Sequence, residues 1–410
     1  MEWNLPSGID YADNAVYSHI NKYVNIESMD LDTHPVDDNS FMNDIRNQSE
    51  FKGISFSNYK KTEVKQALME NMLKMKLEPA CNWCAELLCA GHLMDIWEII
   101  LYFVGKHIHL GNPRLTIYLE NRYHIFRNIM SQSNFTNELQ ARNNINIRKL
   151  FSEIICVLTL SPRKHSFEPI RINRVEEFNI TLMTERLKAP SVKYAEPIFE
   201  KEDPKELYIT INEFSYSISK DGLNLMRACY WIEWLIEFDA ICKKRRQVCK
   251  CQRRTHIVVD TKFQRDIIWM IWDSLMHYVE IDKHSEFVKK TIQSLLHLFC
   301  IKYSTACCKK RRYLLYFAVG LLTENITTNI EIISSENKRL LASVVEQIHV
   351  VYKQIKKNEV SPNTEYLFSN VENENNLERS RKKLEIMDSM GTIPRKGDKS
   401  TEEEDDELFR

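Results

Sequence analysis

The sequence is poor in the two residues that interrupt regular structure. Its 410 residues include only 9 Gly and 11 Pro, whereas an average protein has roughly 7% Gly and 5% Pro. Gly makes tight turns easy and Pro breaks helix interiors. This scarcity argues against a protein of many short strands joined by tight turns, and it favours long helices.

Long apolar runs are also missing. The longest one, Tyr313–Leu322, is far shorter than the roughly 18 to 20 residues that a bilayer span needs, so it predicts a buried helix and no membrane contact. The first residues have no basic segment followed by an apolar run, so we expect no secretory signal. The 11 Cys lie mostly in apolar helical patterns, which predicts a reducing, intracellular compartment without a disulfide framework.

The chain has no large excess of either charge and no common catalytic motif. Its 56 basic and 57 acidic residues leave a net charge of −1, so any electrostatic function has to be local. A Gly-rich phosphate-binding loop, a His-Glu-x-x-His zinc motif and a nucleophile elbow are all absent from the sequence. An enzyme is therefore disfavoured.

What the chain does contain is an internal repeat. The segment Ala80–Leu88 resembles Ala228–Ile236 at an offset of 148 residues, and Arg148–Leu158 resembles Arg312–Leu321 at an offset of 164. In the first segment the apolar residues recur at helical period, which predicts one buried face. The larger offset means that about sixteen residues entered the second copy, and 243–260 is the obvious insertion.

The predicted fold is all-α, with two tandem copies of a multi-helix unit. We expect a polar irregular arm at 1–58, a first repeat at 59–162, a linker at 163–206, a second repeat at 207–357 and a polar tail at 358–410. The tail ends in the acidic run Glu402–Glu407, which repels itself and predicts disorder.

The most specific local feature is Cys242–His256, which holds seven basic residues and no acid. A second basic run follows at Lys309–Arg312. If the fold brings the runs together, they predict a patch that contacts nucleic-acid phosphates; two solvated loops or a nuclear-localisation string are the alternative. The predicted contact residues are Lys243, Lys244, Arg245, Arg246, Lys250, Arg253, Arg254, Lys309, Lys310, Arg311 and Arg312.

The same insertion suggests a zinc site. Cys242, Cys249, Cys251 and His256 supply three thiols and an imidazole, a donor set that suits Zn²⁺. Their spacing lacks the paired C-x2-C of common zinc knuckles, so free thiols on a basic loop remain the alternative. The surrounding cations are expected to lower the pKa of these thiols.

One stretch resembles a known family. Ala80–Pro113 has the spacing A-x-x-W-x-A-x-L-L-x-x-G, then a helix and His-Leu-Gly-Asn-Pro, and it is similar to the C-terminal collar of the RarA/MgsA clamp-loader-like ATPases. The ATPase module of that family is missing here, so the resemblance implies a helical oligomerisation or DNA-maintenance module without ATP hydrolysis. The abundance of Asn, Ile and Lys resembles uncharacterised proteins of nucleocytoplasmic large DNA viruses, which implies the viral factory, the nucleus or the virion as the setting.

These observations predict a non-enzymatic binding or scaffold protein, an accessory factor in viral nucleic-acid replication or maintenance. Its expected partners are proteins and a nucleic-acid backbone; it could form oligomers, and it requires no cofactor unless the zinc hypothesis holds. A structural or virion-assembly protein that binds other proteins is one alternative. An enzyme with its site between the repeats is another, and converging Glu, His or Cys side chains of perturbed pKa would favour it.

Overall fold

The computed structural model describes residues 40–133, 135, 137–174, 176–178, 183–328, 330–361 and 381–385. Within these ranges the regular structure is helical, and the one exception is an isolated bridge between Ile54 and Lys60. The all-α prediction is therefore confirmed. No helix in the described ranges is long and apolar enough to span a bilayer. The first 39 residues and the acidic run Glu402–Glu407 lie outside the described residues.

Contacts divide the chain into two units, one formed by residues 1–42 and 47–358 and the other by 43–46 and 359–410. Within the second unit, the amide of Val360 donates to the Asp44 carboxylate (2.9 Å) and the amide of Ile45 donates to the Val360 carbonyl (3.3 Å). Both predicted repeats therefore belong to a single compact unit, and the fold below is that of this larger unit.

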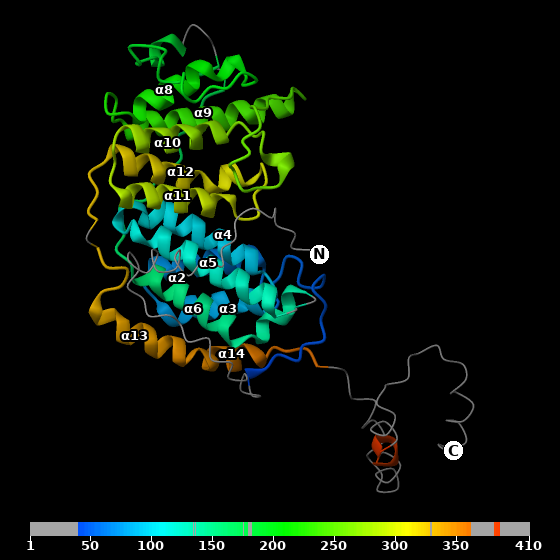
Figure 1. Ribbon diagram of the computed structural model, residues 1–410. Helices are drawn as coiled ribbons and strands as arrows, with labels where there is room; N and C mark the ends of the chain where they lie inside the picture. The colour runs from blue at the N-terminus through cyan, green and yellow to red at the C-terminus, as the bar shows by residue number, and fades with distance from the viewer. Residues whose placement is uncertain are drawn as a thin grey trace, which may run out of the picture. The chain divides into compact units, whose positions relative to one another are not determined.

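The first half of the larger unit contains five α-helices, counted over its described residues. They are α2 (Lys61–Leu73), α3 (Leu77–Cys89), α4 (Leu93–Phe103), α5 (Arg114–Gln132) and α6 (Ile145–Leu160). Helix α3 packs against α2, α4 and α6, and α5 packs against α6 (Figure 1). Ala80, Cys84 and Leu87 of α3 are buried, as the apolar pattern predicts, and Trp97 of α4 is fully buried beside them.

The second half also contains five α-helices among its described residues. Its helices are α8 (Tyr208–Ile218), α9 (Leu225–Lys244), α10 (Trp269–Ile281), α11 (Glu286–Cys300) and α12 (Cys307–Thr323). Helix α9 packs against α8 and α12, as α3 packs against α2 and α6, and α11 packs against α12, as α5 packs against α6. A duplicated unit predicts such matching neighbours; the duplication itself stays a prediction.

The helices after α12 do not extend the second half. The segment at 324–334 leads to α13 (Ser335–Glu346) and α14 (Ile348–Lys356), which pack against α6 and α3 of the first half (Figure 1). The guanidinium of Arg148 lies over the ring of Tyr352, with its Cζ atom 4.0 Å from the ring centroid. The boundary predicted for the second repeat, 207–357, therefore includes two helices that belong spatially to the first.

The halves meet along α5–α11 and α4–α12. Helix α4 runs into a π-helical turn at Val104–Ile108, where Gly105 lies against the backbone of Tyr313 and Leu314 in α12. A Cβ atom at Gly105 would lie only 3.0–3.1 Å from those atoms. Two backbones thus come into direct contact at a position where a larger residue would require the facing backbone to shift by a few tenths of an ångström.

A buried carboxylate lies in the α5–α11 contact. Glu120 of α5 accepts a hydrogen bond from Ser294 (2.6 Å) and one from His297, both on α11. Burial alone would raise the pKa of Glu120, but the His297 hydrogen bond and charge, with Lys290 and Ser294, outweigh it and hold the pKa at about 2. The carboxylate is therefore ionised at neutral pH and ties the two halves together.

Candidate nucleic-acid interface

The two basic runs border one cavity. Helix α9 continues to Lys244 at the start of the first run, and α12 begins at Cys307 just before the second. A cavity of about 310 Å³ lies between these helix ends, and both Lys243 and Lys309 line it. The fold therefore brings together two runs that are far apart in the sequence.

The cavity has an apolar interior and a polar wall. Its apolar lining consists of Leu235, Ile236, Ala240, Ile267, Ile268 and Ala306. Its polar lining includes Asp239, Asp266, Tyr303 and Cys308, besides the two lysines. Concave sites of this kind, mostly apolar with a few polar groups, are typical of small-ligand binding.

The polar groups in the wall form a connected chain. The Tyr303 hydroxyl donates to Asp266 Oδ2 (3.1 Å) and lies 2.9 Å from Cys308 Sγ. Lys250 Nζ donates to the other carboxylate oxygen of Asp266 (2.5 Å). Burial raises the pKa of Tyr303 and raises that of Cys308 to about 12, so both groups stay protonated at neutral pH.

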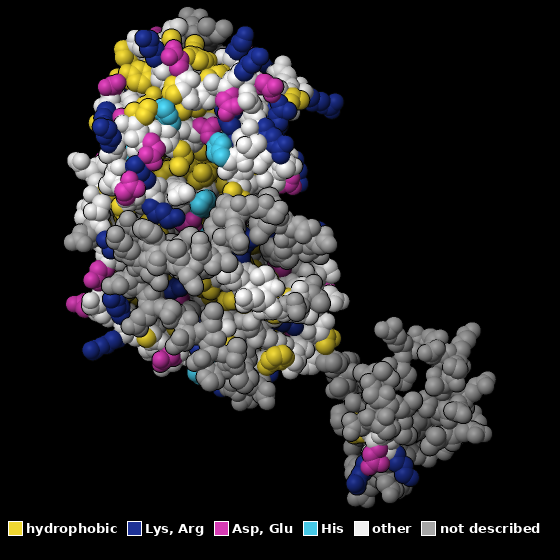
Figure 2. Space-filling view, in the orientation of Figure 1, with side chains coloured by type: hydrophobic (Ala, Val, Ile, Leu, Met, Phe, Trp, Pro, Cys, Tyr) yellow, Lys and Arg dark blue, Asp and Glu magenta, His cyan; other side chains and the backbone are white. Residues whose placement is uncertain are grey.

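The loop after α9 carries the exposed cations. Lys244, Arg245 and Arg246 are exposed and make no ion pair with the described residues, and neither does Lys310 at the start of α12. Figure 2 shows Lys and Arg side chains on the side of the molecule where α9 ends, with carboxylates among them. Four charges at this site are thus available to an outside anion.

The lysines that line the cavity are already paired, although loosely. Lys243 contacts Asp239 one turn earlier, and Lys309 Nζ lies 3.3 Å from Glu237. Both lysines are about half exposed or more, with 48% and 63% of their side chains accessible. Exposed ion pairs contribute little free energy, so an incoming phosphate can compete for these lysines.

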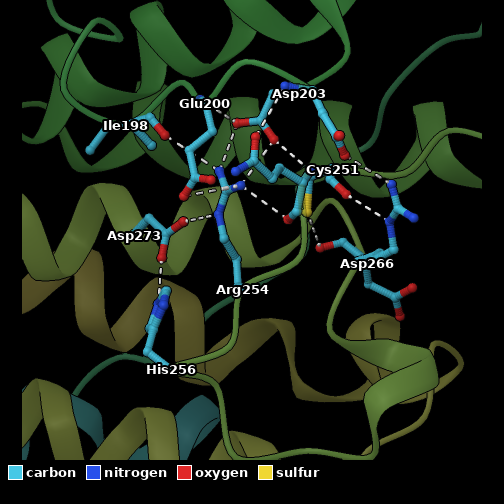
Figure 3. Close-up of polar contacts among 11 residues, drawn as sticks. Ile198, Glu200, Asp203, Cys251, Arg254, His256, Asp266 and Asp273 are labelled. Atoms are coloured by element: carbon cyan, nitrogen blue, oxygen red, sulfur yellow. Dashed lines mark hydrogen bonds and ion pairs between the residues drawn. The ribbon is translucent and has the colours of Figure 1, made fainter.

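Arg254 is a correction to the predicted contact set. Its guanidinium is buried and donates to Asp203 (2.7 and 3.0 Å) and to Asp273 (2.6 Å) (Figure 3). It also donates to the carbonyl of Ile198 (3.4 Å) and pairs with Glu200 at 3.5 Å. Two buried or half-buried carboxylates neutralise this arginine, so it is not available to a phosphate.

Arg254 instead fixes the base of the insertion to its surroundings. Asp203 comes from the linker and Asp273 comes from α10 (Figure 3). The backbone amide of Gln252, in the insertion, also donates a hydrogen bond to Asp203 (2.8 Å). The insertion thus has a rigid, buried base near Arg254. The exposed loop at 243–248 projects from it.

Arg311 and Arg312 are the other corrections. Both are buried: Arg311 pairs with Glu98 and donates to the Phe299 carbonyl (2.5 Å), and Arg312 pairs with Glu233 (2.8 Å). Lys250 and Arg253 are engaged by Asp266 and Gln264. The exposed cations that remain at the site are Lys243, Lys244, Arg245, Arg246, Lys309 and Lys310.

The four predicted zinc ligands fall into three separate contacts. Cys242 and Cys249 are hydrogen-bonded to each other, Cys251 Sγ donates to the Asp266 carbonyl (3.4 Å), and His256 Nε2 lies 2.9 Å from Asp273. In the described part of the chain, no three His, Cys, Asp or Glu side chains form a group that could hold a metal. The zinc site stays a prediction.

The expected lowering of the thiol pKa values is wrong. Burial raises the pKa of Cys249 and of Cys251 to about 12, and it raises that of Cys242. The cations of the loop extend into solvent, where water screens their charge, while the sulfur atoms face the protein interior. These cysteines are thiols at neutral pH.

The cavity itself was not predicted. Tyr303 and Cys308 flank the start of the second basic run, but neither belongs to a motif, and Asp266 reaches them only through the fold. Comparisons with protein-family models, with curated proteins and with solved structures find no match. The resemblances to the RarA/MgsA collar and to viral proteins therefore stay expectations, and function has to be argued from the site.

Proposed function

We propose that this protein is a non-enzymatic helical scaffold that binds a nucleic-acid backbone through the cations around the cavity between α9 and α12. The observation that carries the proposal is that Lys243 and Lys309, one from each basic run, line the same cavity. Lys and Arg that neutralise phosphates release counterions, which drives binding without reading the sequence.

The arrangement of the charges supports this proposal. Lys244 is exposed at the end of α9, Arg245 and Arg246 are exposed on the loop that follows, and Lys310 is exposed on helix α12. The bonds from Arg254 to Asp203 and to Asp273 of α10 hold the base of the insertion in place, which limits the ordering that binding requires. The net charge of −1 makes the rest of the surface a poor competitor for the same backbone.

The biological setting is proposed on the resemblances alone. An accessory role in viral nucleic-acid replication or maintenance fits a helical module without catalytic motifs. A virion-assembly protein that binds only other proteins is the rival, and the presence or absence of salt-sensitive nucleic-acid binding separates the two.

The test compares the full chain with a variant in which Lys244, Arg245, Arg246 and Lys310 are all replaced by Gln. Affinity for a fluorescent oligonucleotide is measured by anisotropy over a series of salt concentrations. Each lost phosphate contact should reduce the slope of log K against log salt by about 0.7 for a single strand or 0.9 for a duplex. We expect a reduction of roughly three across the four substitutions.

A matched control removes four other exposed cations, Lys52, Lys76, Lys338 and Arg339, by the same change to Gln. The control should keep the wild-type slope and affinity. Equal losses in the two variants would show diffuse attraction rather than a site. Absence of binding at about 50 mM salt would reject the proposal and favour the protein-binding scaffold.

A further inference from the structure

We propose that the cavity between α9 and α12 holds one unpaired nucleotide of the bound strand, with its base inside and its phosphate at Lys243 and Lys309. This inference rests on the proposed function and names its substrate class: a strand with at least one unstacked base. At about 310 Å³ the cavity lies at the lower end of the range for small-molecule sites.

The interior suits a flat, largely apolar ring. Leu235 and Ile236 come from α9, and Ile267 and Ile268 come from the segment that enters α10, so two elements supply apolar lining to the cavity. Every nucleobase has an apolar face, and single-stranded nucleic acid is commonly held by burying it. A fully hydrated anion such as free phosphate would gain nothing from these walls.

The polar wall selects among the bases. Asp239 and Asp266 line the cavity, and an ionised carboxylate can only accept hydrogen bonds. Because the oxygens of Asp266 already accept from Tyr303 and Lys250, Asp239 is the carboxylate proposed to meet the base. A base with an exocyclic amino group can donate to such an oxygen, as cytosine N4 does. Uracil and thymine present carbonyl oxygens at the corresponding position and would be repelled. The cavity should therefore prefer cytosine, adenine or guanine.

The mouth suits the phosphate. Lys243 and Lys309 lie on the cavity lining, and each is held only by an exposed ion pair. Helix α12 begins beside them, with Ala306 at its N-cap and no side-chain hydrogen bond to cap it. The positive end of a helix dipole adds to the attraction that the two lysines exert on a phosphate.

The corresponding place in the first half is occupied by a side chain. By the repeat offsets of 148 and 164, Asp239 corresponds to Gly91 and Tyr303 to Leu139. Leu139 packs directly on Gly91: a Cβ atom there would lie 3.1 Å from its side chain. The space that the second half leaves open is thus filled in the first, which is expected of a site acquired by one copy.

The test measures binding of cytidine and uridine 5′-monophosphates to the full chain by NMR line broadening or calorimetry, with inorganic phosphate as a competitor. We expect cytidine monophosphate to bind more tightly than uridine monophosphate, by on the order of fivefold or more. Equal affinity for the two nucleotides would overturn the inference. So would displacement of cytidine monophosphate by inorganic phosphate at equal concentration, because the site would then hold an anion only.

Two variants test the location. Ala240→Phe fills the cavity and should abolish nucleotide binding; the double change Lys243→Gln and Lys309→Gln alters only exposed side chains and should weaken binding about tenfold. Unchanged nucleotide affinity in the lysine double variant overturns the inference even if Ala240→Phe fails to fold.

The same variants distinguish this inference from the proposed function. The loop variant that lacks Lys244, Arg245, Arg246 and Lys310 should lose affinity for oligonucleotides yet still bind cytidine monophosphate. Ala240→Phe should lose binding of cytidine monophosphate yet keep the salt dependence of oligonucleotide binding. If oligonucleotides bind as proposed but no mononucleotide does, the cavity inference fails alone.

Discussion

The two halves of the larger unit differ most at the end of one helix. In the first half α3 ends at Cys89, and α4 begins at Leu93 after a short connection. In the second half α9 continues to Lys244, and residues 245–268 intervene before α10. The longer helix and its insertion accompany an open cavity, whereas Leu139 fills the matching space in the first half.

Other features are alike in both halves. Arg148 and Arg312 occupy matching positions near the starts of α6 and α12, both are buried, and each turns back to a preceding carbonyl. Arg148 Nε donates to the carbonyl of Arg142 (2.6 Å), and Arg312 Nε donates to that of Lys309 (2.8 Å). The two halves therefore share a helical arrangement and differ in the segment at 245–268, which is where function should be sought.

The largest loss of stability is expected from replacing Arg254, which holds the base of the insertion in place. Arg254→Ala leaves the buried carboxylate of Asp203 without its ion-pair partner, so the free energy of unfolding should fall by about 3–5 kcal/mol. Urea unfolding followed by circular dichroism measures this loss. Arg253→Ala, an exposed neighbour, is the control and should change stability by less than about 1 kcal/mol. Equal effects would mean that the network in Figure 3 does not hold the insertion.

The second-largest loss of stability should come from weakening the α5–α11 contact between the halves. Glu120→Gln removes the charge that His297 and Lys290 pair with. Because the pKa of Glu120 is lowered to about 2 in the folded state, its contribution is present above pH 4.5 and is lost as the pH falls toward 2. At one pKa unit per 1.36 kcal/mol, the variant should lose on the order of 3 kcal/mol at pH 7.

Unfolding measured from pH 7 down to pH 2 checks this dependence. The difference between wild type and Glu120→Gln should shrink steadily below pH 4.5. Glu286→Gln, which alters an exposed carboxylate on α11, the helix that contacts Glu120, should show no such convergence. A constant difference across the whole range would mean that packing, not charge, joins α5 to α11.

A smaller effect should follow from making the first half resemble the second. Leu139→Ala removes the side chain that packs on Gly91 and opens a space between α3 and the turn at Glu138–Asn143. A loss of about 2 kcal/mol in unfolding free energy is expected, at the low end for buried Leu to Ala because the site lies near the surface. A change below about 0.5 kcal/mol would show that the contact with Gly91 contributes little packing.

The smallest effect concerns stability and the exposed loop. Replacing Lys244, Arg245, Arg246 and Lys310 by Gln removes no buried contact, so the unfolding free energy should change by less than about 0.5 kcal/mol. The measurement matters because it shows that any lost nucleic-acid affinity is not a folding defect. A large destabilisation would show that these side chains contribute to the stability of the helical fold.

Sequence patterns predicted the helical fold better than they predicted how its parts pack together. The helical period of residues such as Ala80, Cys84 and Leu87 reports local burial, so the all-α fold could be predicted. The packing of α13 and α14 on the first half could not, because their apolar faces indicate that they are covered but not by which partner.

The site was predicted only in outline. Charge runs mark where cations gather, and Lys243 and Lys309 do line one cavity. Composition does not tell which cation turns inward: Arg254, Arg311 and Arg312 each meet a carboxylate that is distant in the sequence. The same reason explains the thiols, whose pKa values depend on burial and not on the neighbouring lysines.

The backbone contact at Gly105 has an evolutionary consequence. The π-helical turn brings Gly105 against Tyr313 and Leu314, where a methyl group would force the facing backbone to move slightly. Related chains that carry Ala or Ser at this position should have a compensating change in the facing turn of α12, or a one-residue deletion that restores an ordinary helix. In such lineages the packing of α4 against α12, and with it the angle between the halves, would drift.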